Sequence, residues 1–212
     1  MGILFLILSI IIFSIIKILE YYFISWLWFF AGFFWIGGII LLIIFIVLQI
    51  IKIIKFRKNI KIIYIINVAV FLLFLYLHIN IKIINRIIEK SDWKILYTAR
   101  AKIIEKVINN ELNPNVEWNN IVCQLPFEFP IVSNGGNDIL IYRYSDNTVT
   151  VQFYIYRGFF EHPVTAFVYT NNKVVVDKIN QYIINNTENN WKINENWFRL
   201  FGMDINDNYY FE

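Results

Sequence analysis

Long stretches without charged side chains restrict the folding of this sequence more than any other feature. Residues 21–51 contain no Asp, Glu, Lys or Arg, and the same is true of residues 3–16 and 62–81. About 20 apolar residues are needed for a helix to cross the ~30 Å hydrocarbon core of a lipid bilayer. The sequence therefore predicts about three transmembrane helices, at residues 3–19, 27–50 and 62–81, within a membrane region that covers residues 1–81.

The charge-free segment 21–51 is longer than one membrane crossing. Its first half is aromatic, and Trp side chains favour the headgroup level of a bilayer, so we expect the crossing to begin near residue 27. Gly37 and Gly38 interrupt the bulky residues of this segment. Combined with His78 near the end of the third predicted span, they leave a transport or channel subunit with a broken helix as one alternative.

Five cationic side chains lie between the second and third predicted spans. No acidic residue lies among them, and they are Lys52, Lys55, Arg57, Lys58 and Lys61. Short loops rich in Lys and Arg stay on the cytoplasmic side of a membrane, and each cation near anionic lipid contributes about 1 kcal/mol. We interpret residues 52–61 as a basic cytoplasmic loop that contacts the membrane surface. This orientation predicts a bacterial plasma-membrane protein whose C-terminal part lies outside the cytoplasm, although Lys82, Arg86, Lys90 and Lys94 argue for the opposite side.

The overall charge hides two different halves. Residues 1–84 carry a net charge of +6 and residues 85–212 carry −3, which together make the formal +3 of the chain. An acidic C-terminal half argues against nucleic acid as a partner, because phosphate binding needs clustered cations. One Cys and two His cannot supply a zinc site of the usual sulfur and nitrogen ligands, and we expect no cofactor.

The C-terminal half has the patterns of a small α+β domain. Residues 82–92 form a helical connector, and apolar residues recur at helical spacing from residue 93 to 112. Apolar alternation with period two predicts strands at residues 138–145, 148–157 and 164–170, and a further strand at 197–201. The predicted fold class is thus a membrane α-helical N-terminal half followed by an α+β domain, residues 93–204, with an antiparallel β-meander packed on an amphipathic helix. Residues 205–212 form a tail.

One face of the predicted meander is rich in tyrosine and is our candidate interaction face. It consists of Tyr142, Tyr144, Gln152, Tyr154 and Tyr156. Tyrosine is favoured where a surface is half buried against a partner. The alternative is that a short helix at residues 177–186 covers this face. Both remain open from the sequence.

Catalytic candidates are few. His162, with Cys123 or Glu161, is the one group that could support nucleophilic or acid–base chemistry. However, His162 precedes Pro163 in a tight turn, and Cys123 lies in an apolar run that predicts an inert buried thiol. The phosphate-binding, hydrolase and zinc-protease motifs are absent. We therefore expect a non-enzymatic, membrane-anchored protein-interaction or ligand-binding module. Its expected partners are the lipid bilayer and a protein partner or second copy, and a membrane-bound enzyme is the alternative.

Overall fold

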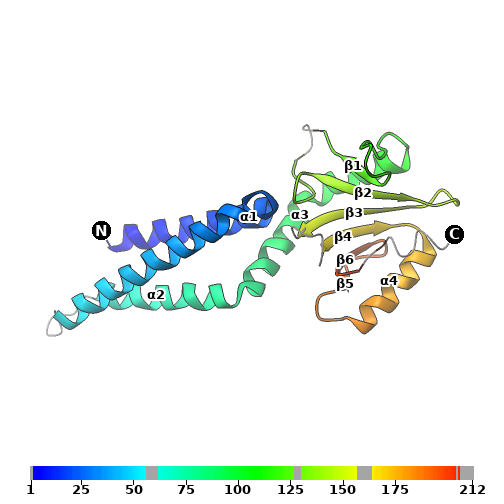
Figure 1. Ribbon diagram of the computed structural model, residues 1–212. Helices are drawn as coiled ribbons and strands as arrows, with labels where there is room; N and C mark the ends of the chain where they lie inside the picture. The colour runs from blue at the N-terminus through cyan, green and yellow to red at the C-terminus, as the bar shows by residue number, and fades with distance from the viewer. Residues whose placement is uncertain (1, 56–61, 127–129, 157–163, 204, 206–212) are drawn as a thin grey trace. The chain divides into compact units, whose positions relative to one another are not determined.

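The computed structural model describes residues 2–55, 62–126, 130–156, 164–203 and 205. The chain divides into two compact units, Met1–Ser91 and Asp92–Glu212, which are treated separately below. Figure 1 shows the helices of the first unit and the sheet of the second.

The first unit is helical. It contains α1 (Gly2–Lys55), α2 (Ile62–Ile79) and the first part of α3 (Ile81–Ile108), which continues into the second unit. No proline precedes Pro114, so nothing removes a backbone donor from these helices. α1 is helical throughout its 54 residues, and Figure 1 shows it bent back on itself. Asn80 separates α2 from α3, and its amide side chain donates a hydrogen bond to Tyr76 O at 2.9 Å.

The prediction of three transmembrane helices is wrong. Among the helices that the structure describes, none is both long enough and apolar enough to cross a membrane. The predicted spans 3–19 and 27–50 required helix ends that α1 does not have. α2 ends at Ile79, before the predicted end of the third span at residue 81. Apolar composition alone does not determine where a helix begins and ends, and the predicted spans differ from the helices in these ends. The predicted membrane class and plasma-membrane localisation are therefore also wrong.

The second unit is built on one antiparallel sheet of six strands. In chain order these are β1 (Val122–Gln124), β2 (Asp138–Arg143), β3 (Val149–Tyr156), β4 (Thr165–Thr170), β5 (Trp191–Lys192) and β6 (Trp197–Phe201). Their order across the sheet is β1-β2-β3-β4-β6-β5, with α4 (Lys173–Asn185) between β4 and β5 in the chain. The turn between β2 and β3 contains Asn147 at a φ of 62°, a left-handed conformation that Asn tolerates.

The strand register divides the sheet into two buried faces. Ile139, Phe153 and Phe167 are aligned on neighbouring strands and belong to one face. Trp93 of α3 packs on this face, with its ring centroid 4.8 Å from Phe167 and 5.0 Å from Trp197. The expected pairing of the aliphatic face with the helix after residue 93 is therefore present in the structure.

The opposite face is covered by α4. Val175 and Ile179 of this helix belong to the same core cluster as Leu140, Val168 and Phe198. The second unit is consequently a sheet with one helix on each face. α4 begins at Lys173, earlier than the predicted residue 177, because Asn172 caps it: Asn172 Oδ1 accepts a hydrogen bond from Val175 N at 3.1 Å.

The connector predicted at residues 82–92 and the helix predicted from residue 93 are not separated at Ser91 and Asp92. α3 runs without interruption through both residues. Ser91 Oγ donates to Ile87 O at 2.9 Å, which is a bond within a helix and not a cap. Asp92 is instead paired with Arg100, as described below.

Candidate functional site

The predicted tyrosine face lies mostly inside the second unit. Tyr142 and Tyr154 are only 1% and 7% exposed, and Gln152 is also buried. Tyr144 is partly buried and donates its hydroxyl to Thr150 Oγ1 at 3.2 Å. Tyr156, at 41% exposure, is the one member of the five with an exposed side chain. A partner role for this face stays a prediction, but α4 covers the greater part of it.

The catalytic candidates are not brought together in the described residues. Cys123 is fully buried in β1, and its burial, helped by the negative charge of Asp138, raises the pKa of the thiol. A protonated thiol is a poor nucleophile. Glu161 and His162 lie outside the described residues. Within the part of the chain that the structure describes, no group of three or more His, Cys, Asp or Glu side chains could hold a metal ion.

The predicted basic loop is described only at its beginning. Lys52 and Lys55 lie in the last turn of α1 with exposed side chains, and Lys52 Nζ is 6.0 Å from the Tyr64 ring. Arg57, Lys58 and Lys61 lie outside the described residues, so a surface contact for the five cations stays a prediction. The backbone of Gly37 and Gly38 is helical within α1. The side chain of His78 is not described.

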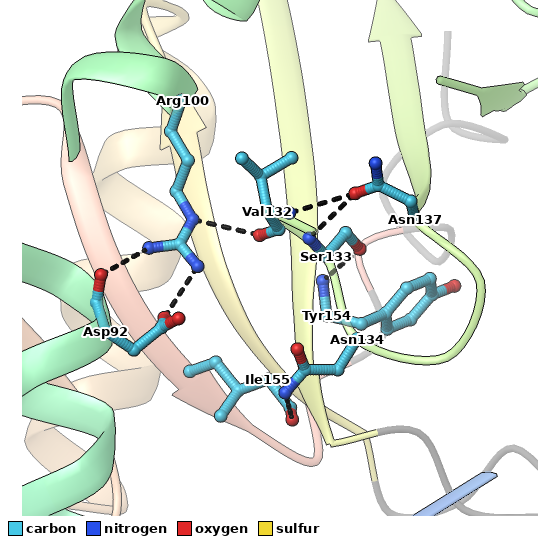
Figure 2. A network of polar contacts seen from close by, with 8 residues as sticks. All are labelled: Asp92, Arg100, Val132, Ser133, Asn134, Asn137, Tyr154 and Ile155. Carbon is cyan, nitrogen blue, oxygen red and sulfur yellow. Dashed lines mark hydrogen bonds and ion pairs between the residues drawn. The ribbon is translucent and has the colours of Figure 1, made fainter. Parts of the chain in front are cut away.

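A buried ion pair within α3 holds Arg100, and Arg100 in turn connects α3 to the loop before β2 (Figure 2). Arg100 Nη2 lies 2.6 Å from Asp92 Oδ2, and both side chains are almost fully buried. Arg100 Nε also donates to Val132 O at 3.0 Å. The guanidinium carbon lies 4.8 Å from the centre of the Phe167 ring, within cation–π range. Sequence reasoning missed Arg100, although its position seven residues after Trp93 and three before Ile103 puts it on the apolar face of the helix.

The loop that receives Arg100 is itself closed by hydrogen bonds (Figure 2). Asn137 Oδ1 accepts from Val132 N and Ser133 N at 2.9 and 3.2 Å. Ser133 Oγ accepts from Tyr154 N at 2.9 Å, and Asn134 Nδ2 donates to Ile155 O at 2.6 Å. These bonds join residues 132–137 to β3. The network therefore holds the loop in place, and its donors and acceptors are used within the protein.

A second polar network holds the start of α4 against the turn between β2 and β3. Asn172 Nδ2 donates to Thr148 Oγ1 at 2.7 Å, and Thr150 Oγ1 donates to Thr170 Oγ1 at 2.8 Å. Asp146 lies exposed in the turn, and hydrogen bonds from Thr148 lower the pKa of its carboxyl group. The side chains of this network hydrogen-bond to one another, so the network serves to hold α4 and the turn together.

The β1 edge of the sheet is closed by one side chain. Asn115 Oδ1 accepts from Gln124 N at 2.8 Å, and Asn115 Nδ2 donates to Gln124 O at 3.0 Å. Asn115 N donates to Val122 O at 3.1 Å. The amide thus occupies the positions that a further strand would use, which disfavours strand addition at this edge.

An open hollow lies where α4 ends and β5 begins. It has a volume of about 420 Å³. Six polar residues contribute to its lining, together with Tyr182, Phe201 and Gly202; the polar residues are Asn185, Asn186, Thr187, Glu188, Asn189 and Asn190. This size is within the usual range of small-molecule sites, and no pattern in the sequence marked it in advance.

Hydrogen bonds hold the wall of this hollow. Tyr182 Oη donates to Phe201 O at 2.8 Å and links α4 to β6. Asn190 is buried, donates to Asn186 O at 2.8 Å and accepts from Phe201 N at 2.6 Å. Asn186 Nδ2 donates to Tyr182 O at 3.1 Å. The hollow is therefore preformed by contacts that join one helix, one loop and one strand.

The second unit thus belongs to the class of α+β domains in which a six-stranded antiparallel sheet carries a helix on each face. No protein-family model, curated protein or solved structure matches this chain.

Proposed function

We propose that the unit Asp92–Glu212 is a non-enzymatic binding module that takes a small, uncharged polar ligand in the hollow at the end of α4. The observation that carries this proposal is the preformed wall made by Tyr182, Asn190 and Phe201. A site that is already organised loses less conformational freedom on binding.

Protein groups already occupy the other candidate surfaces of the second unit, which favours the hollow as the binding site. α3 and α4 cover the two faces of the sheet. Asn115 occupies the β1 edge, and the networks of Arg100 and Asn172 are satisfied by protein groups. Cys123 is buried as a thiol. Among the described features, the hollow combines access for a ligand with several polar side chains.

The chemistry of the lining indicates the kind of ligand. Each Asn carboxamide offers both a donor and an acceptor, which suits hydroxyl and amide groups. Tyr182 and Phe201 supply aromatic surface for an apolar ring face. Glu188 is the charged member of the lining, and the C-terminal end of α4 carries partial negative charge. The negative end of the helix disfavours an anion.

Three probes of similar size and different charge test this proposal. N-acetylglucosamine is neutral, glucosamine is cationic and glucuronate is anionic. Added to the full-length protein, the neutral probe should shift the backbone NMR signals of residues 185–190 and 201–202, and glucuronate should leave them unchanged. The variant Asn185→Ala with Asn189→Ala should reduce the shifts at least severalfold.

The matched control is Asn109→Ala, an exposed amide at the end of α3. It should bind the neutral probe as the wild type does. Shifts elsewhere in the protein, shifts that survive the double substitution, or an equal response to glucuronate would each contradict the proposed site.

A further inference from the structure

The packing of α1 against α2 brings two amide side chains to the same level. The two helices contact each other and are joined by residues 56–61, so they run in opposite directions. Lys52 Nζ lies 6.0 Å from the Tyr64 ring, which aligns these two positions. Three residues back along α1 and three residues forward along α2 lie on the same faces, one turn further on. These positions are Gln49 and Asn67.

Both amides are buried in an apolar seam. Gln49 and Asn67 are 5% and 7% exposed, whereas Leu48 and Ile66 beside them are 50% and 41% exposed. Among residues 43–55 of α1, the less exposed described positions are 46, 49 and 53. Among residues 62–73 of α2, they are 63, 64, 67, 68, 70 and 71, a set that includes 64, 67 and 71 at spacings of three and four. This is the spacing with which two helices pack side chains into each other.

The oxygen of each amide is left without a hydrogen-bond partner. Gln49 Oε1 and Asn67 Oδ1 are both buried, and neither accepts a hydrogen bond. A buried acceptor without a donor is costly, because it has lost its contacts with water and gained nothing in exchange. Each residue also carries an NH₂ group, so each has what the other lacks.

We infer that Gln49 and Asn67 form a reciprocal amide pair across the seam. Gln49 Nε2 donates to Asn67 Oδ1, and Asn67 Nδ2 donates to Gln49 Oε1. The inferred pair requires rotation about a terminal side-chain bond, which exchanges the oxygen and nitrogen of a carboxamide. In this pair, Gln49 Oε1 and Asn67 Oδ1 each accept a hydrogen bond, and neither helix has to move.

This pair gives the contact between α1 and α2 a defined orientation. Ile46, Ile53 and Phe71 are apolar, and apolar side chains alone tolerate rotation of one helix against the other. With one polar layer in such a seam, any other packing of the two helices leaves the amides buried without hydrogen bonds, which raises its free energy. Gln49 and Asn67 therefore select one packing of the helix pair.

Side-chain NMR and hydrogen exchange of the full-length protein test the pair. In the wild type, the NH₂ protons of both residues should exchange slowly and show contacts with each other. Gln49→Leu or Asn67→Leu leaves one amide alone, and either should speed exchange of the α2 backbone amides roughly tenfold. The double substitution removes both amides and should speed exchange less than either single change.

The exchanged pair, Gln49→Asn with Asn67→Gln, is the matched control. It keeps one amide on each helix and should retain slow exchange in α2, which a role in packing volume alone does not predict. Additive effects of the two leucine substitutions would overturn the inference. So would side-chain NH₂ protons that exchange as fast as those of an exposed amide in the wild type, a result that does not depend on any variant folding.

Discussion

Arg100 carries its positive charge into the interior of the second unit, and three contacts compensate for the lost hydration. Asp92 supplies the opposite charge at 2.6 Å, Val132 O accepts a hydrogen bond, and the Phe167 ring lies beneath the guanidinium. Burying a charge is costly unless it is both paired and hydrogen-bonded. The pair also holds the guanidinium where its Nε reaches Val132 O, and this bond ties the loop before β2 to α3.

Replacing Arg100 by Met should lower the free energy of unfolding of this unit by about 3–5 kcal/mol, because the Asp92 carboxylate then stays buried without a partner. Urea titration followed by hydrogen exchange of the β2 and β3 amides measures this loss. Asp92→Leu with Arg100→Met should lose less than Arg100→Met alone. Lys102→Met, an exposed change in the same helix, serves as the control. An equal loss in the single and double variants would count against the ion-pair explanation.

At the scale of the element, the strands differ in how far their edges are protected. β1 is short and pairs with β2. Ile121 O accepts from Ile141 N, and Leu125 N donates to Asn137 O, so the backbone groups of the odd-numbered residues in this segment point toward β2. The even-numbered residues, Val122 and Gln124, face outward and are bonded to Asn115. The backbone and side chain of one residue, Asn115, thus take the positions of a further strand at this edge.

Asn115→Ala should open the β1 edge. The Gln124 amide loses its acceptor, so its hydrogen exchange should become at least tenfold faster while the β3 amides keep their protection. Light scattering should also show more self-association, since an unpaired edge is a template for strand pairing. Asn109→Ala is again the control. Unchanged exchange at Gln124 would show that Asn115 does not protect the edge.

The elements could be predicted from the sequence to different extents. β2, β3, β4 and β6 are long enough for alternation with period two to be visible, and they lie where the pattern placed them. β1 and β5 have three and two residues and contain too little alternation to detect. The predicted division between the connector and the helix from residue 93 is absent from α3, because Asp92 binds Arg100, eight residues away, and does not cap a helix.

At the scale of the molecule, the boundary between the two units falls inside α3, between Ser91 and Asp92. The residues just after this boundary are structural parts of the second unit. Asp92 holds Arg100, and Trp93 packs on Phe167 and Trp197. The helix must therefore be present from Asp92 onward for the sheet to be covered.

A fragment of residues 88–212 should keep the hydrogen-exchange protection of the sheet. A fragment of residues 94–212 should lose most of it, because it lacks the partner of Arg100 and the largest aromatic contact of α3. The full-length protein is the reference in both cases. Equal protection in the two fragments would contradict the assignment of Asp92 and Trp93 to the second unit.

The sequence by itself determined the strands of the meander and the separation of their side chains into two faces, because alternation is a property of neighbouring residues. Tertiary structure decided which faces are covered. It placed Tyr142 and Tyr154 beneath α4, buried the ion pair of Asp92 and Arg100 against Val132 and Phe167, and set helix ends that differ from those of the predicted spans. Burial and pairing depend on segments that are distant along the chain, and no local pattern records which of them will meet.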